Sequence, residues 1–377
     1  MRIGFDGKRA VQNFTGLGNY SRYVADILCH FYPENDYVLY APKKRENKRM
    51  NLLTGQYRQL TLAYPATSFW KKLSSLWRVW GITSQLEKEG IELFHGLSNE
   101  LPLNIHKSRI KSIVTIHDLI FLRYPQYYQS IDRKIYTYKF RKACENADKI
   151  IAISECTKRD IIRYFNIPDD KIEVVYQGCD VSFTHPVTEE KKKEVRKKYQ
   201  LPDHYILNVG SIEERKNILA AVQALPMLPQ HIHIVIVGRR TGYTEKVEQF
   251  IKDNGLGERV HIISNVPFND LPAFYQSAEI FVYPSRFEGF GIPIIEALYS
   301  GIPVVAATGS CLEEAGGPDS IYVTPDDITG LADAFKQIYS NSDKRKNMVE
   351  KGREFAKRFS EKQQSEEIIN IYKKLIR

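Results

Sequence analysis

Residues 280–305 read IFVYPSRFEGFGIPIIEALYSGIPVV, and this stretch decides the fold class. It starts with a short apolar run at 280–283, passes through a glycine-containing loop and a segment of helix length, and ends in a second apolar run from Pro303. A strand, a loop, a helix and a second strand in this order form a βαβ unit, in which the two strands are parallel. The stretch therefore predicts a parallel sheet with the loop at the carboxyl end of one strand.

The same alternation extends outward through all 377 residues. In the first half we expect strands at 2–5, 37–40, 60–62, 93–95, 112–116 and 149–153, with helices near 17–31, 68–89, 130–146 and 155–165. In the second half we expect strands at 205–209, 233–237, 260–263, 280–283 and 303–306. A chain of this length exceeds one ordinary hydrophobic core. The predicted fold class is α/β, with two doubly wound, Rossmann-like parallel-sheet domains that face each other across a cleft.

The boundary between the two domains is predicted where the periodicity lapses. Residues 181–186 separate the last pattern of the first half from a highly charged helix that begins at Glu189. We therefore expect an N-terminal domain at 1–181 and a second domain at 182–360.

Charge and cysteine content narrow the classes of partner. The formal net charge of +9 fits nucleic acid, anionic lipid or a phosphorylated small molecule. We find no zinc-finger spacing, RRM motif or basic recognition helix, so nucleic acid is disfavoured. Five scattered cysteines without a CxxC pair indicate reduced thiols. With no secretion signal and no apolar run of membrane-spanning length, we expect a cytoplasmic protein whose membrane contact, if any, is peripheral.

The loop at 288–291 has the features of a phosphate site. Gly289, Phe290 and Gly291 lead into a helix that starts near Ile292, and glycines let a ligand approach the backbone while the first turn offers free N–H groups. Glu288 in the loop and Glu296 in the helix are placed to bracket one elongated ligand. The alternative is a strand-loop-helix joint whose glycines serve packing alone.

A second motif, VGSIEERKN at 209–217, follows the first strand of the second half and contains Gly210 and Ser211. Arg215 and Lys216 supply a planar fork and a point charge, which suit the negative charge of a departing diphosphate. An exposed basic pair is the alternative, although cations are unfavourable at a helix N-terminus unless an anion is bound.

The first half offers a weaker set of candidates at predicted strand ends. Residues 15–20, TGLGNY, contain Gly16 and Gly18 but not the full GxGxxG spacing, so a nicotinamide cofactor is poorly supported. His117 and Asp118 follow the apolar strand at 112–116, on the ligand side of an open sheet. His95, Asn99 and Glu100 follow the strand at 93–95, where a loop cap explains them equally well.

Together these motifs resemble those of the family 4 retaining glycosyltransferases. Residues 288–305 are similar to the family's E-x7-E motif with its trailing G-x-P-V-V strand, and residues 210–217 are similar to its G-x(4)-RKN pattern. The resemblance implies a GT-B fold in which the domain at 1–181 binds the acceptor and the domain at 182–360 binds the nucleotide sugar. It also implies that the final helix, 361–377, crosses back to the first domain. It implies that Glu288 holds hydroxyls of the donor sugar and Glu296 the ribose, and that Arg215 and Lys216 stabilise the leaving group.

The resemblance also implies roles for other residues. His117 would contact the donor sugar, Gly16 and Gly18 would approach the donor phosphate or the acceptor, and Val266 would lie near the base. The donor-binding set is completed by Gly210, Ser211, Gly289, Phe290, Gly291 and Ile292, and the acceptor candidates are Asp118, His95 and Asn99. The segment 264–268, SNVPF, departs from the family's usual glycine after the strand.

Residues 15–20, 117–119 and 123–125 in the first half are similar to those of bacterial mannosyltransferases of polysaccharide or O-antigen assembly. This resemblance implies GDP-mannose as donor, with a UDP-sugar as the alternative, and a glycan or lipid-linked acceptor.

No residue is a persuasive nucleophile for double displacement, so we expect same-face substitution. No DxD-like motif lies in the expected cleft loops, so no metal or cofactor is expected. Other classes left open are a sugar-nucleotide epimerase, a dehydrogenase and a non-catalytic carbohydrate-binding scaffold.

A basic aromatic segment runs from Ser68 to Trp80. Its apolar residues recur at spacings of three and four, and lysines occupy other faces of the predicted helix. Such a helix suits the interface of an anionic bilayer, at the inner face of the cytoplasmic membrane, or it packs on its own sheet.

Overall fold

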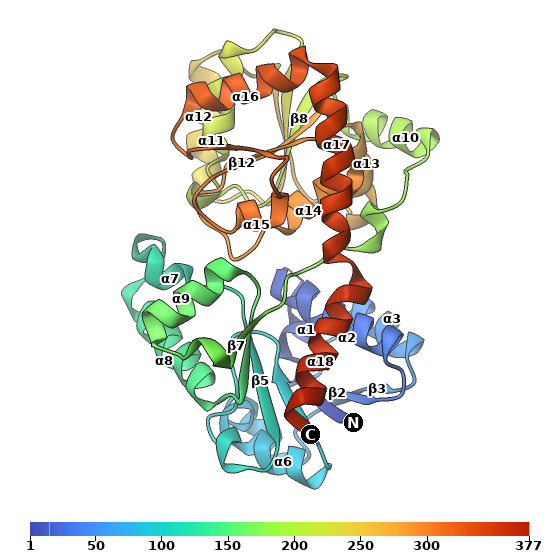
Figure 1. Cartoon of the computed structure of the whole chain (residues 1–377), viewed down its shortest axis with the longest axis vertical. Helices are drawn as coiled ribbons and strands as arrows, with labels where there is room; N and C mark the ends of the chain where they lie inside the picture. Colours follow the sequence, from blue (N-terminus) through green and yellow to red (C-terminus); the bar gives the residue numbers. More distant parts are fainter. Residues whose placement is uncertain (15, 377) are drawn as a thin grey trace. The chain divides into compact units, whose positions relative to one another are not determined.

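A computed structural model describes residues 1–14 and 16–376 of the chain (Figure 1). The chain divides into two compact units, unit 1 with Met1–Gln177 and Glu361–Arg377, and unit 2 with Gly178–Ser360. The units part between Gln177 and Gly178, slightly before the position expected from the lapse in periodicity. Thr15, the first residue of the predicted glycine loop, and Arg377 lie outside the described residues.

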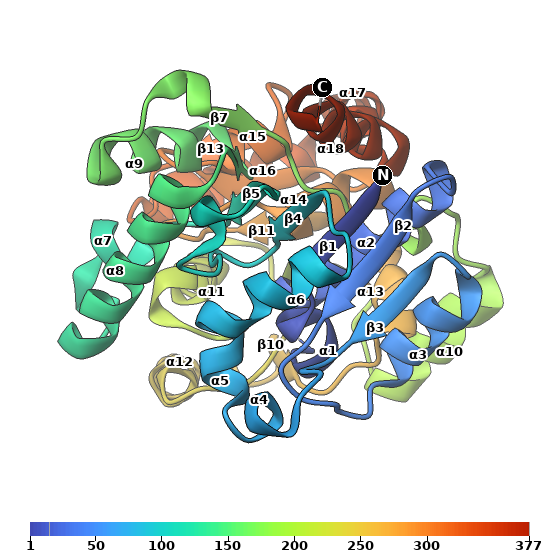
Figure 2. The same ribbon diagram turned by 90° about the horizontal axis from the view of Figure 1, so that it is seen from below.

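Unit 1 is built on a seven-stranded parallel sheet of order β3-β2-β1-β4-β5-β6-β7. Its strands are β1 (Arg2–Asp6), β2 (Asp36–Tyr40), β3 (Leu60–Ala63), β4 (Leu93–Gly96), β5 (Lys111–Ile116), β6 (Lys149–Ala152) and β7 (Ile172–Val174). After the exposed first residues of β1 and β5, successive residues of β1, β4 and β5 are buried because helices cover both faces. One face packs against α2 (Gly16–Phe31) and α18 (Glu361–Ile376), and the other against α6 (Ile82–Lys88), α8 (Ser130–Asn146) and α9 (Glu155–Phe165) (Figure 2).

Unit 2 repeats the plan with a six-stranded parallel sheet of order β10-β9-β8-β11-β12-β13. Its strands are β8 (Tyr205–Val209), β9 (His233–Val237), β10 (Val260–Ile263), β11 (Ile280–Tyr283), β12 (Val304–Ala307) and β13 (Ile321–Val323). The helices include α10 (Glu189–Tyr199), α11 (Ile218–Ala224), α12 (Tyr243–Asp253), α13 (Leu271–Ser277), α14 (Ile292–Ser300), α15 (Leu312–Gly316), α16 (Ile328–Ser340) and α17 (Ser342–Ala356). The βαβ unit predicted from 280–305 is therefore β11, α14 and β12.

Each sheet has one topological switch point. The chain runs outward from β1 through β2 to β3 and then returns to the other side of β1 with β4, and in unit 2 it does the same around β8 with β11. Ligands of open parallel sheets bind beyond the carboxyl ends of the strands at such points. The loops that follow β1 and β4, and those that follow β8 and β11, are thus the places to look for a site.

The single helix expected over 68–89 is broken into four pieces. They are α4 (Ser68–Lys72), α5 (Ser74–Leu76), a π-helical turn η1 (Trp77–Gly81) and α6. Leu73 leaves the helical region with φ −106° and ψ 40°. Trp77 is fully buried with its Nε1 donating to Gln85 at 3.1 Å, and a Cβ on Gly81 would lie 2.6 Å from the ring of Trp70. Packing of the two tryptophans therefore overrides the regular helical period.

The predicted loop before the first long helix is also different. A short helix, α1 (Lys8–Gln12), follows β1, and α2 already begins at Gly16, so Gly16 and Gly18 lie in its first turn. A Cβ on Gly18 would lie 2.0 Å from the carbonyl oxygen of Asn13. Close packing of this turn on the preceding segment accounts for that glycine.

Candidate active site

The switch point of unit 2 is shaped by two glycines at strand ends. Gly210 follows β8 with φ 155°, which side chains rarely adopt, and a Cβ there would lie 3.3 Å from Nζ of Lys216. A Cβ on Gly238, which follows β9, would lie 1.7 Å from the carbonyl oxygen of Gly210. The backbone at the ends of β8 and β9 is therefore held close together, and the Lys216 side chain lies over it.

Arg215, Lys216 and Glu288 form one charged cluster at this point. Nη1 of Arg215 lies 2.8 Å from Oε2 of Glu288, and Nζ of Lys216 lies 3.2 Å from Oε1. Their side chains are only 15%, 17% and 13% exposed. Burial opposes ionisation of Glu288, but Lys216 and Arg215 outweigh it and lower its pKa to about 2. Burial opposes the charge on Lys216 as well, and Glu288 outweighs that effect, so its pKa is raised.

Two residues that the sequence reasoning missed complete this cluster. Nζ of Lys216 donates to the hydroxyl of Tyr283 at 2.9 Å, and that hydroxyl donates to Oε1 of Glu288 at 3.2 Å. The hydroxyl of Ser285 donates to the same Oε1 at 2.8 Å. Tyr283 ends β11 and Ser285 follows it. Both residues could have been predicted as site residues from this position at the switch point. The carboxylate is thereby fixed in one orientation.

The N-terminus of α14 lies directly after this loop. Gly291 is the N-cap, Pro293 occupies the first turn without an N–H, and the amide of Ile294 donates to the carbonyl of Gly291 at 2.9 Å. The amide of Ile292 has no acceptor among residues 1–14 and 16–376. A free N–H at the positive end of the helix dipole is suited to a phosphate oxygen.

The buried thiol of Cys311 holds the loop at 288–291 in place. Sγ of Cys311, which is fully buried, donates to the carbonyls of Glu288 at 3.0 Å and Phe290 at 2.9 Å. The ring of Phe290 is buried against Phe359, with 5.6 Å between ring centroids. Only the main chain of Phe290 is therefore available to contact a ligand.

Glu296 lies farther along α14 in a different environment. The hydroxyl of Tyr275 donates to its Oε2 at 2.6 Å. Burial raises the pKa of Glu296 to about 7, Tyr275 opposes this shift, and the charge of Asp180 adds to it. The two glutamates of the motif thus differ: Glu288 is held ionised, and Glu296 titrates near neutral pH.

The remaining donor candidates of unit 2 lie at strand ends. The hydroxyl of Ser211, after β8, donates to Glu213 at 2.6 Å. Val266 follows β10 and is half-buried, next to Asn265 with φ 58°. Asp327 caps α16, because its carboxylate accepts from the amide of Gly330 at 2.8 Å. Among residues 1–14 and 16–376, no group of three or more His, Cys, Asp or Glu is arranged to hold a metal ion.

In unit 1, His117 is buried and has partners at both ring nitrogens. Its Nε2 donates to the carbonyl of Leu97 at 2.9 Å, and the amide of Gln177 donates to its Nδ1 at 3.2 Å. Burial lowers its pKa to about 4 although the Leu97 bond opposes this shift, so the ring is neutral at pH 7. Sequence reasoning missed Gln177, which no motif marks.

The predicted acceptor residues of unit 1 have structural partners instead. His95 is fully buried, with Nδ1 at 2.6 Å from the hydroxyl of Tyr372 in α18 and Nε2 at 2.8 Å from Thr115, and burial lowers its pKa to about 3. The prediction that His95 contacts the acceptor is wrong, because its ring joins β4, β5 and α18 in the core. Asn99 is buried and accepts from the amide of His117 at 2.8 Å, and Asp118 accepts from the amide of Ile120 at 3.1 Å.

Two family profiles match the chain. "Glycosyltransferase Family 4" matches residues 21–183, and "Glycosyl transferases group 1" matches residues 188–355. The chain is 31% identical to O-antigen chain mannosyltransferase B of Escherichia coli over 289 residues, 75% of this chain and 74% of that one. It is 29% identical to O-antigen chain mannosyltransferase RfbU of Salmonella typhimurium over 225 residues, 60% of each chain.

The fold also matches solved structures. HepE of Anabaena, solved in complex with UDP and glucose, superposes with a TM-score of 0.77 over the full length of both chains at 17% identity. At this identity the likeness concerns the fold alone. It confirms the predicted GT-B fold class.

Proposed function

The chain belongs to the family 4 glycosyltransferases, and on that premise we propose that it transfers mannose from GDP-mannose to a glycan or lipid-linked acceptor in the assembly of a cell-surface polysaccharide. Its mannosyltransferase relatives act on O-antigen chains, and their names support this sugar and this class of acceptor. The observation that carries the proposal is the cluster of Arg215, Lys216 and Glu288 at the switch point of unit 2.

The geometry of the cluster supports a different role for each of its charged residues. Glu288 accepts hydrogen bonds from a sugar hydroxyl, and its firm ionisation makes it a good acceptor. Arg215 and Lys216 stabilise the negative charge that grows on the diphosphate as it departs, together with the free amide of Ile292. Water-excluded charges of this kind act without reorganisation during the reaction.

Retention of configuration fits a same-face substitution. The bond between the anomeric carbon and the phosphate oxygen breaks on the face at which the acceptor oxygen bonds, and the acceptor hydroxyl gives its proton to the departing phosphate oxygen. Glu288 is a poor nucleophile for the alternative double displacement, because four side chains engage its carboxylate and its pKa is about 2.

The first experiment is a donor screen with EDTA present throughout. GDP-mannose is expected to raise the melting temperature and to be hydrolysed slowly without acceptor, whereas UDP, ADP and dTDP sugars are not. A response to a UDP-sugar alone would show that the donor is a UDP-sugar and not GDP-mannose. UDP-sugars are included because the Anabaena neighbour was solved in complex with UDP. A response that appears only when Mg²⁺ replaces the EDTA would contradict metal independence. Binding of no nucleotide under either condition would leave the epimerase and scaffold alternatives.

The lipid-linked acceptor motivates a second part of the proposal, contact with an anionic membrane at the cytoplasmic face. Phe69, Leu76 and Trp80 are 61%, 44% and 48% exposed, and Lys71 and Lys72 beside them are exposed too. Trp77 is buried, so only part of the predicted apolar stripe faces outward. Among residues 1–14 and 16–376, no helix has both the length and the apolar character to cross a bilayer.

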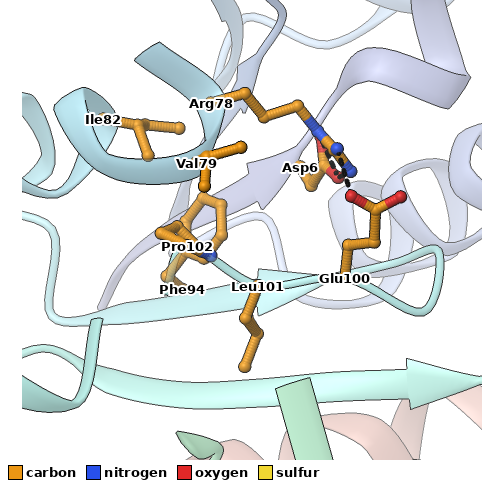
Figure 3. A pocket seen from close by; sticks show the side chains of 8 residues that line it. All are labelled: Asp6, Arg78, Val79, Ile82, Phe94, Glu100, Leu101 and Pro102. Atoms are coloured by element: carbon orange, nitrogen blue, oxygen red, sulfur yellow. Dashed lines mark hydrogen bonds and ion pairs between the residues drawn. The ribbon is translucent and has the colours of Figure 1, made fainter. Parts of the chain in front are cut away.

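The helix α8 extends this exposed face. Eight of the twelve exposed large hydrophobic residues found in the described chain lie either at 69–80 or at 131–138 in α8. Arg78 from the first segment (Figure 3) and Lys139 from α8 both contact Oε2 of Glu100, so the two segments approach each other at that side chain. We call this surface the exposed aromatic face; its residues are Phe69, Leu73, Leu76, Trp80, Ile131, Ile135, Tyr136 and Tyr138.

A further inference from the structure

The His117 ring, which follows β5, is held by a hydrogen bond at each of its nitrogens. Nε2 lies 2.9 Å from the carbonyl oxygen of Leu97, and Nδ1 lies 3.2 Å from the side-chain nitrogen of Gln177. A carbonyl oxygen can only accept, so Nε2 carries the hydrogen and Nδ1 of the neutral ring is an acceptor. The amide of Gln177 is therefore the donor to Nδ1.

The main chain of His117 is held as well. Its amide donates to Asn99 at 2.8 Å, and its carbonyl accepts from the hydroxyl of Thr157 in α9 at 3.3 Å. The ring of Tyr20 packs edge-on against the imidazole, with 4.6 Å between the ring centroids. Of all these contacts, the one with Gln177 decides whether Nδ1 can take up a proton.

Gln177 lies where the chain leaves unit 1. It is the last residue before Gly178, the first residue of unit 2, and it is only 5% exposed. Two residues earlier, the amide of Val175 donates to the carbonyl of Ala152 in β6 at 3.0 Å, so the chain is still attached to the sheet there. The Gln177 side chain thus ties the end of unit 1 to the loop that follows β5.

The surroundings of the ring disfavour a positive charge on it. Burial lowers the pKa of His117 to about 4, the bond to Leu97 opposes this shift, and the charge of Arg9 in α1 adds to it. The titratable groups that face the ring are His95, whose pKa burial lowers to about 3, and Tyr20, whose pKa burial raises to about 12. Within residues 1–14 and 16–376, no carboxylate forms a hydrogen bond or ion pair with the ring. His117 is therefore neutral at pH 7, together with its two titratable neighbours.

A neutral ring suits the chemistry of glycosyl transfer. The transition state carries positive charge at the anomeric carbon and the ring oxygen of the sugar, and an imidazolium nearby would oppose that charge. We propose that Gln177 is a positioning residue of the transfer reaction, whose amide N–H at Nδ1 keeps the His117 ring neutral and in one orientation toward the donor sugar. The inference rests on the proposed function and on the contact of His117 with the donor sugar that the family resemblance implies.

The test replaces the amide with a carboxylate in Gln177→Glu. A carboxylate beside Nδ1 favours the imidazolium, so the pKa of His117 should rise. The assay is hydrolysis of GDP-mannose by the full chain at saturating donor, which needs no added acceptor and removes the effect of Glu296 on binding. At pH 7 the kcat of the variant should be about tenfold or more below that of the wild type. It should recover toward the wild-type value as the pH rises to 9, because the imidazolium then loses its proton.

A second variant separates the effect of charge from that of the lost hydrogen bond. Gln177→Met keeps an unbranched side chain of similar length but offers Nδ1 no donor and no charge. Its kcat should fall several-fold at every pH from 6.5 to 9, without the recovery expected for Gln177→Glu. The control is Gln56→Glu, a change at an exposed glutamine of α3 (Lys48–Gln56) in the same unit, which should keep the wild-type kcat throughout.

The ¹⁵N chemical shifts of the histidine rings, assigned with His117→Gln, give the protonation state of His117 independently of activity. The wild type should show a protonated Nε2 and an unprotonated Nδ1 at pH 7, and Gln177→Glu should show an imidazolium. A neutral ring in Gln177→Glu, or an imidazolium together with the wild-type kcat, would overturn the role of Gln177 and leave the proposed function standing.

The remaining outcomes are decided by folding and by the wild type. If the melting temperature shows that Gln177→Glu does not fold, Gln177→Met decides alone, and a wild-type kcat in that variant would overturn the role of Gln177. If the wild type hydrolyses none of the screened nucleotide sugars, the proposed function fails and the inference fails with it.

Discussion

Lys216 is a buried cation with one carboxylate, one hydroxyl and one aromatic ring around it. Nζ contacts Glu288 and Tyr283, and it lies 5.3 Å from the centroid of the Tyr283 ring. Because Arg215 also contacts Glu288, loss of Lys216 leaves the carboxylate with a cationic partner. The lysine is thus not needed to neutralise the cluster, which favours a role toward the ligand.

Lys216→Ala is therefore expected to impair transfer far more than folding. Removal of one preorganised group that stabilises developing charge typically costs about 10²- to 10³-fold in kcat. The measurement is kcat with GDP-mannose, alongside the melting temperature. Lys246→Ala, a change at an exposed lysine of α12, serves as the control. A Lys216→Ala enzyme with the wild-type kcat would contradict a role for Lys216 in the reaction.

Glu296 predicts a pH dependence of nucleotide binding. Its pKa is raised to about 7, and the expected contact with two ribose hydroxyls requires a carboxylate that accepts at both oxygens, which is the ionised form. The fraction ionised rises through neutral pH, so the Kd for GDP should fall about tenfold between pH 6 and pH 8. Glu296→Gln should bind GDP more weakly and without this trend. A wild-type Kd that stays constant over this interval would contradict the ribose assignment.

The same group has an opposite effect on stability. A carboxyl whose folded pKa exceeds its unfolded value of 4.5 holds its proton more tightly in the folded chain, so stability falls as pH rises from 4.5 through 7. Glu296→Gln should remove this loss of stability. The melting temperature of the variant should therefore rise relative to that of the wild type as the pH increases from 5 to 8. Thermal denaturation of both proteins across this range measures the difference.

At the residue scale, sequence identified the charged members of the unit 2 cluster and missed its neutral ones. Arg215, Lys216 and Glu288 stand in recognisable motifs, whereas Tyr283 and Ser285 are ordinary residues until the turn after β11 directs them to Glu288. His95 shows the converse error. Its position at a strand end suggested a ligand, but its partner Tyr372 lies 277 residues away in α18, and local sequence carries no sign of that contact.

At the scale of elements, the loop between β11 and α14 depends on a residue of the next loop. Cys311 precedes α15 and donates to two carbonyls of residues 288–290, so it fixes the direction in which the amides after them point. Cys311→Ala should raise the KM for the donor several-fold with a smaller change in kcat. Cys311→Ser keeps a donor of similar size and should retain the wild-type KM. Equal donor KM values for the alanine and wild-type enzymes would show that the loop holds its shape without the thiol.

Elements with a clear period were predictable and those shaped by packing were not. The helices at 130–146 and 155–165 and four strands of unit 2 have the predicted bounds. The segment 68–89 fails because Trp77 turns inward and Leu73 leaves the helix, which a count of apolar spacings cannot reveal. The short helix α1 was missed because five residues carry too little periodicity.

At the scale of the whole molecule, exposed apolar area is distributed unevenly. In unit 2 only Val181 and Met227 are exposed large hydrophobics among the described residues, whereas unit 1 has the exposed aromatic face. Lysines and arginines are interleaved with this face, including Lys71, Lys72 and Lys134. Apolar side chains of moderate number with cations beside them suit reversible adsorption to an anionic bilayer.

Vesicle sedimentation tests this face. The chain should bind vesicles that contain phosphatidylglycerol more strongly than pure phosphatidylcholine, and salt should weaken the binding because charges screen one another. A double change of Trp80 and Ile135 to Ser should reduce binding several-fold, since both side chains are exposed, at 48% and 45%. Leu52→Ser is the matched control, because Leu52 is 74% exposed on α3 (Lys48–Gln56), away from the face and beside Lys48 and Arg49. If the control weakens binding as much as the double change, adsorption depends on general charge and hydrophobicity, and the assigned face has no special part in it.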